Sequence, residues 1–560
     1  MEGNLPMRCL PREMMTAASD LQSAEPTTTA VRRSRGLASR AFDPVPIAPL
    51  VQFRIALGLI LLWEAYRYLA EGWPRLLFLD AELLFHYAGF EWVRLLPEQL
   101  HLAVVPALAA LAACLMCGLF YRVAASLLFV GWAYLFLLDQ SLYLNHLYLV
   151  ILIIGLSILL PANRAFSLDV LMRPSLRSAT TPRWTLSLLR AQVGLVYFFG
   201  GVAKLNPDWL SGIPMQQMLL ERAGLIGQPA GEPWIALLFA YGGLLLDLFI
   251  VPLLCWKRTR IAGLLLVAGF HLTNHMLFHI GIFPWFMMAA TLILWPPYPL
   301  SVLSLARIYG SLVGIGILLT LMTGGQIPAW IWGVAVVTTA VLIFPPEELR
   351  RIDAAFRTEP DERPAAEMSP MARSAVLAFL CLYLGWQFLM PLRHFVYDFQ
   401  DGRYGDDASW TEQGHKWAWH MKLRVKRPGA ALFFVLDGDR RIVEMIDPFD
   451  EAGPLTFRQA RTMTTRPDLI LQFAHYLRDK YQQQLGEPVA VTASIQVALN
   501  GRSPQYLIDP EANLAAIEPR LWPPAEWILP LDAPRPELRR VDVAELLRQE
   551  REFLEEEALE

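Results

Sequence analysis

Residues 186–203 read Leu-Ser-Leu-Leu-Arg-Ala-Gln-Val-Gly-Leu-Val-Tyr-Phe-Phe-Gly-Gly-Val-Ala, and Lys204-Leu-Asn-Pro-Asp-Trp209 follows directly. An apolar run of this length predicts a helix that crosses the bilayer core, which is about 30 Å thick. A single lysine closes the run. Such a lysine can extend its amine to the membrane interface, or it can be kept from water and favour its neutral, basic form. The stretch therefore predicts a membrane helix that ends in either an interface lysine or a catalytic base.

The rest of the chain has the same apolar character. Of its 560 residues, 55% are hydrophobic and 18% are charged, and the mean hydropathy is +0.36. Soluble proteins carry about a quarter charged residues. We therefore predict a polytopic α-helical membrane domain with about 8–11 spans, followed by an extracytoplasmic α+β soluble domain. The eleven candidate spans are 49–70, 101–120, 122–139, 145–161, 186–203, 233–255, 259–277, 280–296, 301–322, 327–345 and 373–391.

The predicted domain boundaries follow the changes in composition. Residues 1–41 are polar and lack an apolar core, so we expect a disordered tail and no cleaved signal peptide. The membrane domain covers residues 42–391, and the soluble domain covers residues 392–535. Residues 536–560 predict a charged C-terminal helix lying on the surface. The net charge of −4 and the lack of a basic stripe argue against a nucleic-acid partner.

Basic residues indicate the orientation of the membrane domain. They gather in the N-terminal tail and in alternate loops, which the positive-inside rule assigns to the cytoplasm. The N-terminus is then cytoplasmic and the soluble domain lies outside. Asn145 and His146, which open one predicted span, and Lys204, which closes the next, share the outer side. We expect these three residues to converge beneath the soluble domain.

Hydrophobic alternation predicts strands at 431–436, 441–446 and 489–499 of the soluble domain, and helical spacing predicts helices at 455–463 and 467–484. The cysteines add little to this framework. Four of the five lie in apolar spans and none lies in the soluble domain, so no disulfide joins its parts. The Cys114-x-x-Cys117 pair sits among Ala and Leu residues, which favours packing over redox chemistry.

Several polar residues in the spans are candidates for chemistry. Asn145 and His146 either cap a helix or belong to a functional site, because ionisable groups inside a membrane are costly. Tyr197 precedes Lys204 by two helical turns, on the same face. His271, His275 and His279 also share one face, but the outer two are about 12 Å apart, so we predict no metal site. The aromatic segment 410–423 is typical of an interfacial belt, or of a lid over a lipid-soluble cofactor.

Eight segments of the chain together resemble one family. They are similar to the HTTM membrane domain and the soluble domain of vitamin K-dependent γ-glutamyl carboxylases, over roughly residues 42–532. The segments are Phe53–Gly58, Leu160–Asp169, Lys204–Trp209, Phe270–Asn274, Gly281–Trp285, Trp410–Met421, Phe457–Arg461 and Trp527–Pro530.

The resemblance implies a membrane enzyme of the carbon–carbon lyase class that uses reduced vitamin K (a naphthohydroquinone), O2 and CO2. Such an enzyme converts glutamyl residues of a protein or peptide to γ-carboxyglutamate while the quinol becomes its epoxide. By motif match, Lys204 corresponds to the base that deprotonates the quinol. His146 and Asn145 correspond to the assisting pair, and Tyr197, Trp419 and Met421 are expected to line the quinone pocket.

The chain departs from the animal members of the family at several points. Ala203 stands where those members carry a second lysine, and no cysteine is available after Cys381 for a disulfide to the soluble domain. These features resemble a bacterial homologue in an inner membrane. Three alternatives remain open: a quinol epoxidase or oxidase without protein carboxylation, a non-catalytic scaffold or transporter that retains the fold, and a metal-dependent oxidoreductase built on the histidine ladder.

Overall fold

In the computed structural model, the described residues are 36–278, 280–294, 314, 347, 368–398, 407–519 and 525–557. The chain divides into two units, one up to Asp43 and one from Pro44 onward. In the first unit the described residues form a short helix, α1 (Leu37–Arg40). All architecture below belongs to the second unit.

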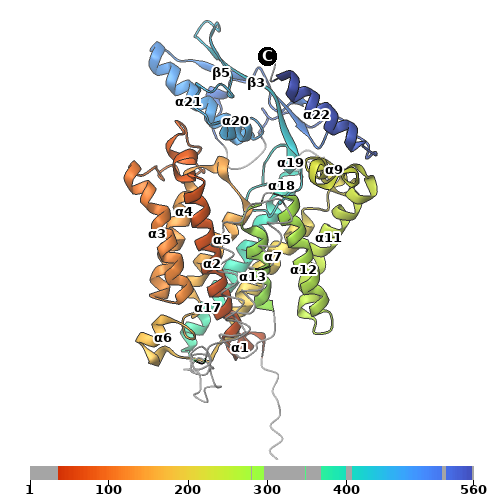
Figure 1. Ribbon diagram of the computed structural model, residues 1–560. Coiled ribbons are helices and arrows are strands. Elements are labelled where there is room, and N and C mark those ends of the chain that lie inside the picture. The colour runs from red at the N-terminus through yellow and green to blue at the C-terminus, as the bar shows by residue number, and fades with distance from the viewer. Residues whose placement is uncertain are drawn as a thin grey trace, which may run out of the picture. The chain divides into compact units, whose positions relative to one another are not determined.

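The membrane domain is helical, as expected (Figure 1). Among the described residues, six helices are long and apolar enough to cross a membrane, which confirms a polytopic domain. A shorter apolar helix, α5 (Asn145–Leu159), packs beside α4. The six are α2 (Ala48–Ala70), α3 (Glu98–Cys117), α4 (Tyr121–Leu138), α7 (Arg183–Val202), α11 (Pro233–Cys255) and α17 (Pro370–Leu389).

Two predicted spans look different in the structure. The 259–277 stretch forms α12 (Arg260–Leu277), whose polar Thr, Asn and His residues keep it below the hydropathy of the six spanning helices. The described part of the 280–296 stretch ends at residue 294 and forms α13 (Phe283–Thr291) and a 3-10 turn (Leu292–Leu294). A glycine turn at Gly281, with φ +56°, delays the start of α13. The predicted spans 301–322 and 327–345 lie outside the described residues.

Close packing between α7 and α11 positions the residues discussed below. A Cβ on Gly201 would lie 2.7 Å from Leu248 Cδ2 and 3.1 Å from the Leu248 backbone nitrogen. Only glycine allows the two helices to approach this closely, as is usual for small residues at membrane helix interfaces. The approach brings the C-terminal end of α7 against the middle of α11.

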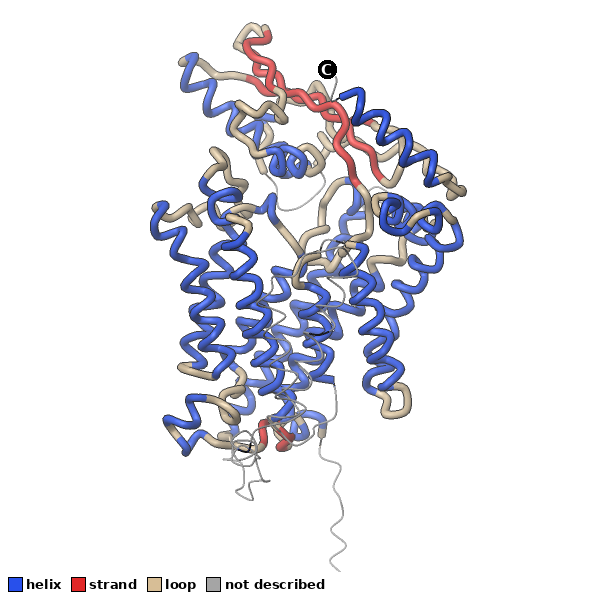
Figure 2. Tube along the Cα trace, viewed as in Figure 1, coloured by secondary structure: helices blue, strands red, loops and turns tan. Residues whose placement is uncertain are grey.

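The soluble domain is an α+β layer above the membrane helices (Figure 2). Its antiparallel sheet has the order β4-β3-β5-β6, formed by β4 (Ile442–Ile446), β3 (Lys426–Leu436), β5 (Ala490–Leu499) and β6 (Gln505–Tyr506). Burial alternates along β5, and the buried face contacts α21 (Pro467–Leu485), which follows α20 (Phe457–Met463). The three predicted strands and two predicted helices are confirmed. The two-residue strand β6 was too short to give a sequence signal.

The C-terminal helix α22 (Val543–Glu557) is more than the charged surface helix that its composition predicts. Val543 is buried in a cluster with Trp209 and Met215, and the Val541 amide donates to the Gly231 carbonyl. The helix is amphipathic, so its apolar side docks while its charges face outward.

Short elements connect these parts. They are β1 (Pro44–Pro46), β2 (Thr180–Pro182), the π-helical turn Arg75–Leu79, α6 (Leu168–Met172), α8 (Pro207–Leu210), α9 (Ile213–Leu220), α10 (Ala223–Ile226), α18 (Arg393–Asp398), α19 (Asp407–Trp410), and the 3-10 turns Gln140–Leu142, Pro174–Leu176, Gln228–Gly231, Leu292–Leu294, Met390–Leu392 and Leu514–Ala516.

A buried charge cluster ties the soluble domain to the membrane domain. Asp208, in α8, accepts hydrogen bonds from Arg502 Nη1 (2.5 Å) and Nη2 (2.7 Å) and from Asn500 Nδ2 (2.7 Å). Arg535 lies 3.0 Å from the same carboxylate. Burial alone would raise the pKa of Asp208, but the hydrogen bonds from Arg502 and Asn500 hold that pKa below its usual range.

We expect Asp208→Ala to lower the free energy of unfolding by about 3–5 kcal/mol, because it leaves the Arg502 guanidinium buried without its partner. Thermal unfolding in detergent measures the loss. Glu221→Ala is the control, since the Arg427–Glu221 pair is half exposed and we expect it to contribute under about 1 kcal/mol. Because folding lowers the pKa of Asp208, the contribution of this residue to the free energy of unfolding is complete above about pH 4 and falls at lower pH. Equal losses in both variants would contradict the assignment.

Candidate active site

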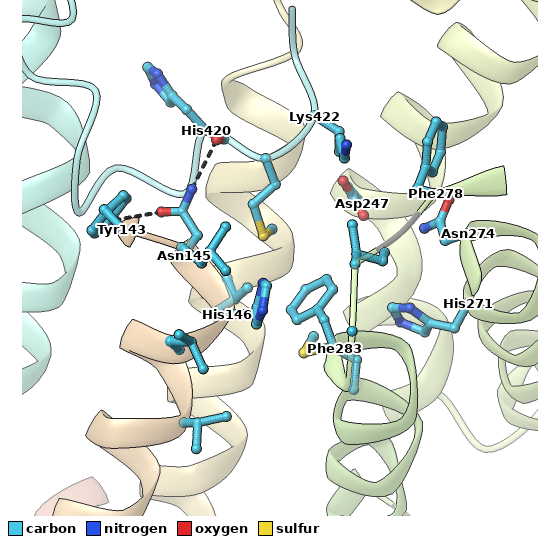
Figure 3. A pocket seen from close by; sticks show the side chains of 18 of the residues that line it. Tyr143, Asn145, His146, Asp247, His271, Asn274, Phe278, Phe283, His420 and Lys422 are labelled. Carbon is cyan, nitrogen blue, oxygen red and sulfur yellow. Dashed lines mark hydrogen bonds between the residues drawn. The ribbon is translucent and has the colours of Figure 1, made fainter. Parts of the chain in front are cut away.

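The membrane helices enclose a cavity of about 940 Å³ beneath the soluble domain. Its volume lies within the usual range of small-molecule sites, about 300–1,000 Å³. Figure 3 shows Asn145 and His146 on one side and Asp247 and His271 on the other, with His420 and Lys422 above. The wall is otherwise largely apolar and aromatic.

A buried ion pair lies at the C-terminal end of α7. Lys204, two residues beyond the last residue of that helix, places Nζ 2.5 Å from Asp247 Oδ2 of α11 and 3.1 Å from the Gly200 carbonyl oxygen. The two side chains are only 8% and 7% exposed. The amine also lies 5.5 Å from the centre of the Trp209 ring. Lys204 thus sits in a dry site with a carboxylate partner.

Sequence reasoning found Lys204 and missed Asp247. The signal was available, because Asp247 is the only Asp, Glu, Lys, Arg or His in the apolar run of α11. An ionisable residue inside a span is by default a functional-site hypothesis. What the sequence could not supply was the partner, since Lys204 and Asp247 are 43 positions apart.

Two glycines leave room for this pair. A Cβ on Gly200 would lie 3.3 Å from Asp247 Oδ2 and 3.5 Å from Met421 Cε, and one on Gly243 would lie 3.9 Å from Lys204 Cε. Met421 belongs to the soluble domain, so that domain reaches down to the ion pair. The predicted pocket residue Met421 therefore lies beside the predicted base.

Asn145 and His146 are adjacent in sequence but do different things. Asn145 Oδ1 accepts from the Tyr143 hydroxyl (2.8 Å), and its Nδ2 donates to the His420 carbonyl (2.9 Å). His146 lines the cavity with its ring 5.9 Å from that of Phe283, and within the described part of the chain it makes no hydrogen bond. Asn145 therefore holds a segment of the soluble domain, while His146 is free to meet a ligand.

The segment that Asn145 holds, the roof loop (residues 411–425), closes the cavity from above. Its conformation is unusual, because four of its residues other than glycine have positive φ, at a cost of roughly 1–3 kcal/mol each. These residues are Glu412, Trp417, Trp419 and Lys422, with φ of 64°, 65°, 59° and 50°. The Trp417 amide donates to the Tyr143 hydroxyl (2.7 Å), a second tie to the start of α5. The loop is therefore fixed over the cavity by contacts outside itself.

Trp419 does not line the cavity. It is fully buried and stacks on Tyr148 at 5.2 Å, while Trp417 meets the same tyrosine edge-on at 4.6 Å. Both tryptophans pack inside the protein, so they do not form a lipid-facing belt. Burial lowers the pKa of His415 and His420, which line the cavity beside them, well below the ordinary value, so both imidazoles are neutral at pH 7.

The histidine ladder is engaged in other contacts. His271 Nε2 lies 2.7 Å from the Tyr197 hydroxyl, and both residues line the cavity. The His275 ring packs edge-on against Trp285, and His279 lies outside the described residues. Among the residues that the structure describes, no group of three or more His, Cys, Asp or Glu side chains is arranged to hold a metal ion.

A second charged pair lies in the cavity wall and was also missed. Glu64 and Arg67 of α2 pair at 2.7 Å, and the Arg67 guanidinium lies 5.0 Å from the centre of the Trp73 ring. The pair sits inside a predicted span, so the same signal that marked Asp247 was present. The cavity thus contains two carboxylates, each neutralised by a base of its own wall.

The fold and this site define an integral membrane protein whose lumenal α+β domain closes a polar centre between apolar helices. Comparison with known families assigns it further. Residues 42–298 match the HTTM domain, and residues 372–534 match the vitamin K-dependent gamma-carboxylase lumenal domain. No solved structure matches the chain. The two domains together cover most of the chain, and the protein belongs to the vitamin K-dependent gamma-carboxylase family.

The different roles of Asn145 and His146 can be separated by hydrogen exchange. We expect Asn145→Ala to raise amide exchange in residues 411–425, because the His420 carbonyl loses its donor and the loop is strained. His146→Ala should leave exchange there unchanged, since that ring holds nothing in place. Mass spectrometry on the protein in nanodiscs measures both. Equal protection in the wild type and in Asn145→Ala would show that the loop does not depend on this contact.

Proposed function

We propose that this protein is a vitamin K-dependent γ-carboxylase-like membrane enzyme, which couples oxygenation of a reduced naphthoquinone to its epoxide with carboxylation of protein glutamyl residues. The observation that carries the proposal is the buried Lys204–Asp247 pair in a cavity that a lumenal loop closes. Family membership supplies the chemistry, and the pair supplies a place where a proton can be received away from water.

The cavity fits a lipid-soluble quinol. Leu238, Leu265 and Leu266 border it, yet each is more than half exposed on α11 or α12, so in the described part of the chain the cavity reaches the lipid-facing surface. A flat aromatic head can lie among Tyr197, Phe283 and Met421, and its tail can leave toward lipid. When bound, the reduced quinone supplies with O2 a base strength that no side chain has, and it departs as its epoxide.

The base that receives the quinol proton is the Lys204–Asp247 pair rather than Lys204 alone. The pair carries no net charge whether its shared proton is on nitrogen or on oxygen, so it can be buried. When it accepts one further proton, it becomes a cation, and that charge balances the anion left on the donor. At 2.5 Å from the amine, Asp247 also fixes the direction in which Lys204 points.

His146 and the roof loop serve the second half of the reaction. A glutamyl γ-hydrogen is removed only where water cannot compete for the base, and the closed loop excludes water from the cavity. His146 presents free ring nitrogens to the same space and can orient the glutamyl group or CO2. Asn145 is a positioning residue, and Trp419 acts only through the packing of the loop.

The same proposal places the N-terminus in the cytoplasm and the protein in a bacterial inner membrane, with the glutamyl protein arriving from the outer side. The alternative is a quinol epoxidase or oxidase that carboxylates no protein. The ion pair and the opening toward lipid are compatible with both activities, so only a measurement of the products distinguishes the carboxylase from the epoxidase or oxidase.

We test the proposal with purified protein in nanodiscs, reduced vitamin K, a glutamyl peptide and labelled bicarbonate. We expect label in the peptide and an equivalent amount of epoxide. Lys204→Met should lower both products by about a hundredfold or more, the usual contribution of general base catalysis. Asp247→Asn should lower both as well, because the amide cannot accept the proton.

Removing one charge of a buried pair destabilises a protein, so the double variant Lys204→Met/Asp247→Asn tests the chemistry without an unpaired charge. It should fold and remain inactive. Lys257→Met, at the exposed far end of α11, is the matched control and should retain full activity. Epoxide without labelled peptide would favour the alternative, and normal turnover in the double variant would refute the assigned base.

A further inference from the structure

Lys422 is a charged residue of the cavity that the proposed mechanism leaves unused. It lies in the roof loop directly after Met421, and its amine lies 5.6 Å from the centre of the Phe278 ring, which also lines the cavity (Figure 3). More than a third of its surface is accessible, yet loss of hydration still lowers its pKa. An accessible side chain and a lowered pKa are compatible if the accessible surface of Lys422 faces the cavity, where protein surrounds the amine on most sides.

In the described part of the chain, no acidic side chain lies within ion-pair distance of this amine. Among the described residues, Lys422 forms no ion pair, and the nearby Glu221 carboxylate pairs instead with Arg427 at 3.2 Å. The φ of +50° at Lys422 means that the loop keeps a lysine where the backbone itself disfavours one. A charged side chain held unpaired against a largely apolar cavity is costly unless a ligand pairs with it.

The charged residues that line the cavity also favour an anionic ligand. Its described lining residues include five lysine or arginine side chains and two carboxylates. The carboxylates are occupied by Lys204 and Arg67. Lys422, Arg458 and Arg466 remain without a carboxylate partner in the described part of the chain, and all three belong to the lumenal domain. The outer end of the cavity therefore attracts an anion.

We propose that Lys422 binds the side-chain carboxylate of an acidic peptide and makes the cavity selective for glutamyl over glutaminyl residues. The inference rests on the proposed function and names the residue that recognises its substrate. The amine donates to the carboxylate from the lumenal side, while the Lys204–Asp247 pair lies deeper, beyond Met421. Arg458 and Arg466 raise the local concentration of the anion without fixing its position.

Binding and turnover test this together. The probes are two end-blocked fluorescent peptides that differ by one residue, Glu or Gln, measured by anisotropy on protein in nanodiscs without quinol. We expect the wild type to bind the Glu peptide about tenfold to a hundredfold more tightly than the Gln peptide, the range for one charge-assisted hydrogen bond. Lys422→Met should lose that preference, and Lys422→Arg should keep most of it.

Turnover separates recognition from folding. Lys422→Met should raise KM for the Glu peptide about tenfold or more and leave KM for the quinol unchanged. Met and Arg bear the same strain at positive φ, so a merely structural role would affect both variants alike. Lys480→Met, outside the cavity, is the control and should match the wild type.

The proposal fails if the wild type binds the two peptides equally, if Lys422→Met keeps the preference, or if Lys422→Arg loses it as fully as Lys422→Met. These binding results do not depend on catalysis. A wild type that prefers the Glu peptide but forms neither epoxide nor carboxylated product would therefore refute the proposed function and still support the carboxylate site.

Discussion

The Lys204–Asp247 ion pair is the constraint around which the membrane domain is organised. Opposite charges in a low-dielectric interior attract strongly, but each has lost its hydration, so neither is tolerated without the other. The pair forms only because Gly201 lets α7 press against α11 and because Gly200 leaves space beside the carboxylate. Losing either partner leaves an uncompensated charge at a cost of about 3–5 kcal/mol. The proposed proton acceptor therefore depends on the packing of α7 against α11 and on the glycines that allow it.

The conformation of the roof loop also depends on the membrane domain, through contacts with the start of α5. The loop's segment 417–420, which includes two of the four residues with positive φ, is held by Asn145, Tyr143 and the aromatic stacking on Tyr148, all at the start of α5. The strain of the loop is thus compensated by contacts with the membrane domain. A soluble domain folded without its membrane partner would lack those contacts, which gives a physical reason for joining the two domains in one chain.

Much of this organisation could be predicted from the sequence, for reasons that are local. Apolar run length marked the spanning helices, and alternation marked β3, β4 and β5, because both patterns act within a few residues. The lysine at 204 and the histidine at 146 stood out as polar groups at span ends. The partner of Lys204 did not, because Asp247 lies 43 positions away and only the packing of α7 against α11 brings the two together, whereas the Glu64–Arg67 pair is local to α2 and was overlooked.

Other misses have similar causes. Trp419 was expected in the pocket from its place in an aromatic segment, but side-chain direction in a loop with positive φ cannot be read from composition. In the predicted span 280–296, a turn at Gly281 places the start of α13 at Phe283, where hydropathy alone suggests a helix from residue 280. For α22, charge density concealed a docking side that begins at Val543. In each case tertiary context overrode a correct local pattern.

The hydrogen bond between Asn145 and His420 joins residues 275 positions apart. During synthesis α5 enters the membrane long before the ribosome has made the segment that covers it, and sequence-distant contacts are the last to form. The cavity thus stays open to water, without its roof loop, until translation is nearly finished. A nascent or truncated chain would therefore have its membrane helices and still lack the segment that covers the cavity.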